Sequence, residues 1–198
     1  MSFISRLRSA TGELHRQLDA SPWAEEAVRS RRGYAGYLER FHRGLAGCWP
    51  EVDWHQAAEL GLPDLEMRQG RYRALESDLA ALGRRIDRMP ARTSAGAAAP
   101  GTTVGCLYVL EGSVHGGRQL LGLLESNTGP VAEAESAFFR GFGERTASSW
   151  REFLAWLELM DPPAGFHEAA EDSARRSFGH FIAAFGGGAT DLQTPTYS

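Results

Sequence analysis

The chain has 198 residues, of which 42% are apolar, and a formal net charge of −4. This length suffices for one domain with a sizeable core, and the mildly acidic balance argues against nucleic acid as a partner. No apolar run reaches the roughly 18 residues of a membrane span and no secretory signal is visible, so the cytoplasm is the expected compartment.

Helical periodicity dominates the sequence, and strand signals are nearly absent. We therefore expect one irregular all-α domain of seven or eight helices over residues 1–188, with a disordered tail at 189–198. The expected helices cover approximately residues 5–19, 23–31, 34–50, 65–82, 102–128, 131–141, 146–160 and 166–186.

Several boundaries follow from local chemistry. Ser21 is expected to cap the second helix, with Pro22 at its first position. The Ala- and Gly-rich stretch 90–101 reads as a loop, after which Thr102 or Thr103 starts the next helix. The two cysteines, Cys48 and Cys106, fall within apolar helical patterns and are expected to be small core residues of a reducing compartment.

The helix expected at 102–128 carries three glycines within six residues, at 112, 116 and 117. Each interior glycine destabilises a helix by roughly 1 kcal/mol relative to alanine. Gly112 and Gly116 lie one turn apart on the same face, so they expose a strip of bare backbone. Such a strip allows close approach of either another helix or a ligand.

Six histidines are the main candidates for chemistry. His15 lies beside the apolar seam of the first helix and is either a structural residue or a ligand. His115 lies among the glycines, four residues after Glu111, and either forms a surface ion pair with it or has a function. The other four have no supporting constellation and are expected to face solvent or to play a supporting role; these are His42, His55, His167 and His180.

Other common chemistries are excluded by their missing motifs. The sequence has no His-Glu-x-x-His pair, no Cys-x-x-Cys, no phosphate-binding glycine loop and no serine nucleophile elbow. A di-iron site needs Glu-x-x-His on each of two helices, and the sequence has this spacing once, at Glu39 and His42. The remaining candidates for a ligand site are a histidine on the first helix and a glycine-rich helix. Haem fits both features, because it needs an axial imidazole on one side and controlled space on the other.

The sequence resembles the haem oxygenases, in particular the bacterial biliverdin-producing type associated with bacteriophytochromes. Four blocks carry the resemblance, in order and over nearly the whole chain. They are Leu7-Arg8-x-x-Thr11-x-x-x-His15-x-x-x-Asp19, the segment 73–80, Tyr108-Val109-Leu110-Glu111-Gly112-Ser113 through Gly116-Gly117, and the helices from Trp150 onward.

The resemblance implies a helical fold with haem, as both substrate and cofactor, between the first helix and the glycine helix. His15 is then the proximal iron ligand, and the backbone at Gly112 and Gly116 covers the distal face. Oxygen and electrons from a reductase or ferredoxin open haem to biliverdin, carbon monoxide and iron, and a bacteriophytochrome is a candidate recipient of the bilin. Ser113 could help to hold water that delivers protons.

Three further residues are candidates for binding haem. Arg8 lies two helical turns before His15, and Arg151 falls where the family carries a base that binds a propionate. Asp19, one turn after His15, could hold the second nitrogen of the imidazole. For each of the three, an ordinary solvated side chain is the alternative.

Two positions depart from the family pattern. Ser113 stands where many members have aspartate, and His115 stands where leucine or serine is expected. If His115 binds iron together with His15, the chain is a non-catalytic haem-binding or haem-sensing protein. A third alternative is an enzyme of the same architecture that binds another ligand, such as a pyrimidine, but that function would not need His15 together with the two glycines.

Overall fold

In the computed structural model, which describes residues 1–90 and 99–186, every regular element is a helix. The all-α prediction is therefore confirmed. Most of the expected loop at 90–101 and the expected tail at 189–198 lie outside the described residues. The α-helices are α1 (Phe3–Asp19), α2 (Trp23–Arg29), α3 (Arg31–Cys48), α4 (Trp54–Glu59), α5 (Leu65–Ala81), α6 (Pro100–Thr128), α7 (Ala137–Arg140), α8 (Thr146–Glu158) and α9 (Phe166–Gly186).

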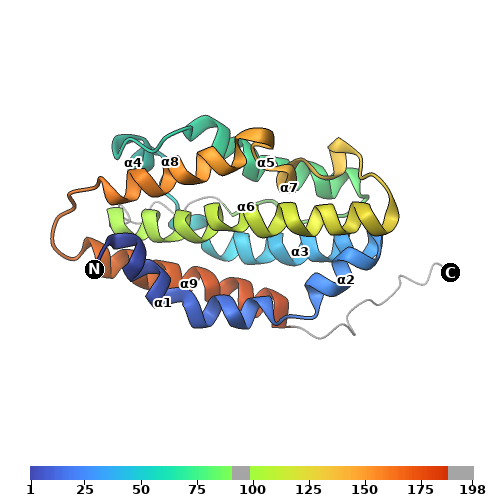
Figure 1. Ribbon diagram of the computed structural model, residues 1–198, viewed down its shortest axis with the longest axis horizontal. Helices are drawn as coiled ribbons and strands as arrows, with labels where there is room; N and C mark the ends of the chain where they lie inside the picture. Colours follow the sequence, from blue (N-terminus) through green and yellow to red (C-terminus); the bar gives the residue numbers. More distant parts are fainter. Residues whose placement is uncertain (91–98, 187–198) are drawn as a thin grey trace.

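The glycine helix α6 is 29 residues long and lies across the middle of the molecule (Figure 1). Helix α9 packs against one side of it, α1 packs against α9 on that same side, and α8 lies on the other side near α5 and α7 (Figure 1). The most extensive helix pairings are those of α9 with α6, α3 and α1. Helix α6 therefore contacts both the N-terminal and the C-terminal parts of the described chain.

Several helices begin at capping residues. The hydroxyl of Ser2 accepts from the backbone N–H of Ser5, and the hydroxyl of Ser30 accepts from Gly33 at 3.0 Å. The carboxylate of Asp53 likewise caps α4, a short helix that the periodicity did not predict. Each cap satisfies a backbone donor that the first turn of a helix leaves unpaired.

Two predicted helix starts were wrong. Helix α2 begins at Trp23 with Pro22 as the N-cap residue, not with Ser21 as the cap and proline inside the helix. Helix α6 begins at Pro100, before either threonine, since proline at the first helical position loses no hydrogen bond. Thr103 is buried instead, and its hydroxyl accepts from the backbone N–H of Asp53 at 3.2 Å.

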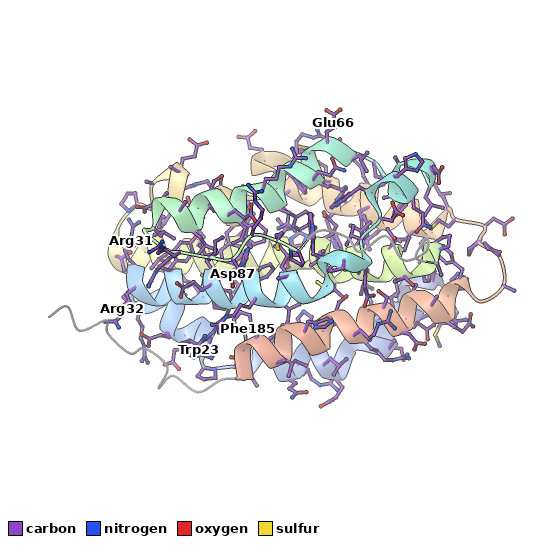
Figure 2. The ribbon with its side chains drawn as sticks, turned by 180° about the vertical axis from the view of Figure 1, so that it is seen from behind. Trp23, Arg31, Arg32, Glu66, Asp87 and Phe185 are labelled. Atoms are coloured by element: carbon purple, nitrogen blue, oxygen red, sulfur yellow. The ribbon has the colours of Figure 1, made fainter. Side chains whose placement is uncertain are left out.

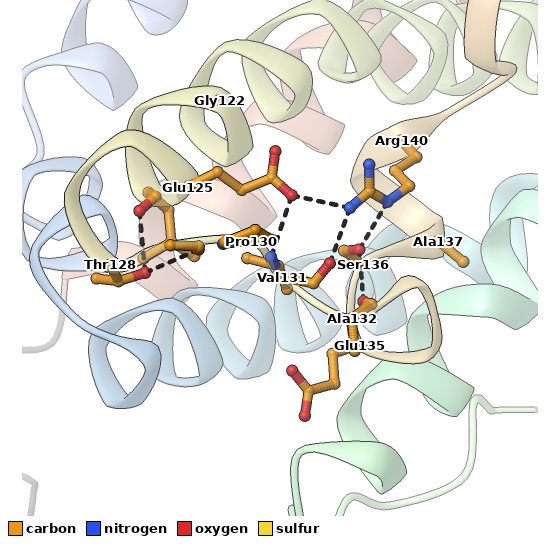
Figure 3. A network of polar contacts seen from close by, with 12 residues as sticks. Gly122, Glu125, Thr128, Pro130, Val131, Ala132, Glu135, Ser136, Ala137 and Arg140 are labelled. Carbon is orange, nitrogen blue, oxygen red and sulfur yellow. Dashed lines mark hydrogen bonds and ion pairs between the residues drawn. The ribbon is translucent and has the colours of Figure 1, made fainter.

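The single helix expected at 131–141 is in fact two short elements, a 3₁₀ turn at Glu133–Glu135 and α7. Side-chain hydrogen bonds of Arg140, and not a continuous helix, hold this segment in place (Figure 3). Its guanidinium donates to the Glu125 carboxylate at 2.8 Å, to the carbonyl of Val131 at 2.9 Å and to the hydroxyl of Ser136 at 2.9 Å. The network ties the end of α6 to α7.

The core is rich in aromatic side chains. Phe41 of α3 contacts Phe138, Phe139 and Phe181 at ring-centroid distances of 4.9–6.0 Å. At the far end of α9, Trp23 and Phe185 lie together (Figure 2), and the indole N–H of Trp23 donates to the Phe185 carbonyl at 2.9 Å. Cys48 and Cys106 are free and buried, as predicted.

Candidate functional site

A cavity of about 770 Å³ lies between α1 and α6, a size typical of sites for small molecules and cofactors. Its inner wall is aromatic, since α3, α7, α8 and α9 all contribute rings. The rings come from Tyr37, Phe41, Phe139, Trp150, Phe178, Phe181 and Phe185. His15 and Asp19 line the cavity from α1, and a stripe of residues from Tyr108 to Leu123 lines it from α6.

On the α1 wall, His15 is held by a neighbour on its own helix. The Nδ1 atom of its imidazole lies 2.7 Å from Oδ2 of Asp19, one turn further along. The ring also meets the edge of Phe178, with 5.7 Å between centroids. A proton on Nδ1 that is shared with a carboxylate leaves Nε2 as the nitrogen able to bind a metal. The side chain is 63% exposed, and its residue lines the cavity.

On the α6 wall, the glycines fall into two groups. A Cβ atom added at Gly105 or Gly117 would lie only 2.0 Å from the carbonyl oxygen of Ala170 or 2.2 Å from Phe139. These two glycines therefore permit close packing inside the protein. A Cβ atom at Gly116 would meet nothing within 4 Å, and one at Gly112 would meet only Trp150, at 3.7 Å. This second pair presents bare backbone to the cavity.

Ser113, beside that bare backbone, also lines the cavity. Its hydroxyl donates to the carbonyl of Leu110 at 2.6 Å. The hydroxyl proton is therefore engaged within the helix, and the oxygen lone pairs remain available to accept from a water in the cavity.

Behind the glycines lies a group of buried polar residues from α5 and α6, here called the buried cluster: Arg68, Arg71, Tyr72 and Glu111. The Glu111 carboxylate forms an ion pair with Arg68 and accepts from the hydroxyl of Tyr72 at 2.6 Å. Arg71 donates to the Leu110 carbonyl at 2.7 Å, the same oxygen that Ser113 uses. Glu111 is 1% exposed, so the expected surface pair between Glu111 and His115 was wrong.

No motif in the sequence indicated the buried cluster, although one signal for it existed. On helix α5, Arg68 and Arg71 lie at helical spacing on the same buried face as Leu75 and Leu79. Charged residues at the inward positions of a helix within a globular domain indicate a buried polar network. Tyr72 is fully buried there, and burial raises the pKa of its hydroxyl.

His115 is exposed but lines the cavity from the α6 side. Its ring meets Trp150 nearly edge-on, at 5.7 Å between centroids and 74° between planes. Partial burial, with a smaller contribution from the positive charge of Arg118, lowers the pKa of the imidazole. The neutral form is thus favoured.

The two candidate arginines differ in position. Arg8 is exposed, but it lies close enough to the Tyr108 hydroxyl to lower the pKa of that group, against the larger rise that burial causes. Since Tyr108 lines the cavity, Arg8 stands at its rim. Arg151 is exposed and does not line the cavity, although its neighbour Trp150 does.

Among the remaining histidines, His42 contradicts the expectation of solvent exposure or a supporting role at the site. It is 4% exposed and lies away from the cavity lining, with its Nε2 atom 3.9 Å from a carboxylate oxygen of Glu76. Burial lowers the pKa of this imidazole. His55 and His180 are exposed, and His167 is half-buried.

Within residues 1–90 and 99–186, no group of three or more His, Cys, Asp or Glu side chains could hold a metal ion. The same residues include no helix long and apolar enough to cross a membrane.

Fold and cavity together define an all-α protein that can hold a flat ligand between a histidine on one helix and bare backbone on another. No model of a protein family matches the chain. The heme oxygenase of Xanthomonas campestris pv. campestris is 33% identical to it over 153 residues, which cover 75% of this chain and 86% of that protein. The chain therefore belongs to the haem oxygenase family, and it is an enzyme of that family.

Two solved structures share the fold. The haem oxygenase of Neisseria meningitidis, in its NO- and CO-bound forms, has a TM-score of 0.72 at 21% identity and covers 96% of this chain and 95% of its own. The haem oxygenase of Leptospira interrogans has a TM-score of 0.69 at 17% identity, with coverages of 93% and 98%.

Proposed function

We propose that this protein binds haem in the cavity between α1 and α6 and opens it oxidatively to biliverdin, carbon monoxide and ferrous iron. Oxygen and electrons from a reductase or ferredoxin are the co-substrates. One observation carries the proposal: Nε2 of His15 is the free imidazole nitrogen on one wall of an apolar cavity whose opposite wall is bare backbone.

The cavity suits a porphyrin on three counts. Its aromatic inner wall excludes water from an apolar macrocycle. The missing side chains at Gly112 and Gly116 let the α6 backbone approach the ring closely. Asp19 lies 2.7 Å from Nδ1 of His15 and fixes the orientation of the imidazole, as partners of metal-bound histidines do.

Bound haem supplies the iron at which oxygen is activated. His15 would hold that iron through its imidazole, which donates less electron density than the cysteine thiolate that favours O–O cleavage. On the other side, the α6 backbone restricts the space for oxygen and limits which edge of the macrocycle it can reach. Ser113 accepts a hydrogen bond from water there and helps to position it for proton delivery.

Arg8 and Tyr108 provide the polar rim for the haem propionates. The chain contains no lysine, and no arginine is among the described residues that line the cavity. A carboxylate at the cavity mouth must therefore find its cation at the rim, where Arg8 lies beside the Tyr108 hydroxyl. Arg151 is the second candidate and requires a side-chain movement to take part. Electron delivery by a reductase and transfer of the bilin to a bacteriophytochrome in the cytoplasm complete the proposed role.

The test is His15→Ala. The purified variant, mixed with haemin, should show an altered absorption spectrum and weaker haem binding, because the axial imidazole is gone. With ascorbate or a ferredoxin reducing system, the parent protein should form biliverdin, identified by chromatography after a single turnover.

His55→Ala is the matched control, since His55 is an exposed histidine outside the cavity. Its spectrum and product should equal those of the parent. Intact haem after every reducing system, or a His15→Ala spectrum identical to that of the parent, would refute the proposal.

A further inference from the structure

The cavity has two imidazoles on opposite walls. His15 lines it from α1 and His115 from α6. No cysteine or methionine is among the described residues that line it, so these two side chains are its candidates for a nitrogen or sulfur ligand to iron.

His115 is in the chemical state that a metal ligand needs. A neutral imidazole has a free lone pair, and both partial burial and the charge of Arg118 favour that neutral form. Its ring packs edge-on against Trp150, and within the described part of the chain its nitrogens form no hydrogen bond or ion pair.

The space beside His115 is open. A Cβ atom at the next residue, Gly116, would meet nothing within 4 Å, and both residues line the cavity. The space that a side chain at Gly116 would fill is therefore empty, and it leaves room beside the His115 ring on the cavity side.

We propose that His115 is a displaceable second ligand of the haem iron, which closes the oxygen side of the cavity. In one position its ring packs against Trp150, and in the other its nitrogen binds iron in place of water. The exchange moves no electrons, and the water leaves unchanged. This inference rests on the proposed function, and it adds a control on access of oxygen to the same site.

The experiment compares the parent protein with His115→Ala and His115→Gln, each loaded with haemin; the glutamine keeps polarity but does not supply an imidazole. The parent should give a low-spin spectrum that hardly changes with pH, as two imidazoles do. Both variants should give a pH-dependent spectrum, because iron-bound water loses a proton at alkaline pH. If His115 occupies iron nine-tenths of the time, azide affinity should rise about tenfold in the variants.

His55→Ala again serves as the control and should behave as the parent does. Equal spectra and equal azide affinity in the parent and both His115 variants would overturn the inference. That result would not bear on His15→Ala, whose spectrum tests the proposed function separately.

Discussion

The two walls of the cavity hold their chemical groups by different means. On the α1 wall, His15 is positioned by Asp19 of the same helix, and both side chains are more than 60% exposed. On the α6 wall, the backbone near Gly112 is fixed from behind by Arg68 and Glu111, which are 0% and 1% exposed. The contact that positions His15 is therefore within one helix and exposed to solvent. The contact that supports the α6 backbone joins two helices and is buried.

This difference matters because the two kinds of contact have different energies. An exposed pair within one helix contributes a few tenths of a kcal/mol, and its partners can separate without harm to the fold. A buried pair holds two helices at a set distance, and the loss of one partner leaves a buried charge uncompensated. The backbone near Gly112 is thus held in place by buried contacts, whereas the side chain of His15 retains freedom to adjust.

The largest expected effect comes from Glu111→Ala. Removal of this carboxylate leaves Arg68 charged and unpaired in the core and deprives Tyr72 of its acceptor. We expect the free energy of unfolding to fall by about 3–5 kcal/mol, measured by urea denaturation of the haem-free protein. The control is Glu13→Ala, which removes the exposed pair with Arg16 and should change stability by less than about 1 kcal/mol. Equal losses of stability in Glu111→Ala and Glu13→Ala would contradict the expected difference between the buried and the exposed ion pair.

The next effect concerns Asp78, which supports the α6 wall through α7. Its carboxylate accepts from the backbone N–H groups of Ala137 and Phe138 at 3.1 and 2.8 Å. Burial nevertheless raises the pKa of Asp78 from 3.8 to about 6. Between these values the folded state holds a proton that the unfolded chain has released, so the contribution of Asp78 to stability falls as pH rises from 4 to 6.

Asp78→Asn should abolish this dependence. The stability of the variant relative to the parent should increase by up to about 3 kcal/mol between pH 4 and pH 6, measured by urea denaturation at several pH values. The amide cannot accept both backbone hydrogen bonds, so the variant is expected to be less stable at pH 4. Parallel stability curves for the two proteins would show that Asp78 titrates normally.

The smallest expected effects separate the two groups of glycines. Gly117→Ala forces a methyl group against Phe139 and should destabilise the haem-free protein by about 1–3 kcal/mol. Gly116→Ala has open space and should stabilise it by up to about 1 kcal/mol through helix propensity, while weakening haem binding. Denaturation and haemin titration measure the two quantities. If Gly116→Ala destabilised the protein and left haem binding unchanged, Gly116 would serve close packing inside the protein and not the approach of a ligand.

Contacts within one helix could be predicted from the sequence. The spacing of His15 and Asp19 indicated their contact, and the spacing of Gly112 and Gly116 indicated their shared face. The long helices were also predictable, because a core on one side imposes a 3.6-residue period on α1, α3 and α9. The assignment of roles to these residues came from the family resemblance and stays a prediction that His15→Ala tests.

Contacts between distant segments could not be predicted. Glu111 was expected to meet His115 four residues away, yet its partners are Arg68 and Tyr72, about 40 positions earlier in the chain. Local spacing favours the nearer partner, and only the crossing of α5 behind α6 makes the other pair possible. The burial of His42 and the short helix α4 were missed for the same reason, since neighbouring elements and not local periodicity determine them.

The position of Trp150 has a practical consequence. This indole packs on Phe153 and lies between Tyr108 and His115, directly on the wall of the cavity. A porphyrin seated there would accept its excitation energy, so the ultraviolet emission of this indole should disappear as the pigment enters. The fluorescence of Trp150 should therefore report whether the cavity is occupied. The variant Trp150→Phe would show how much of the total tryptophan emission comes from this residue.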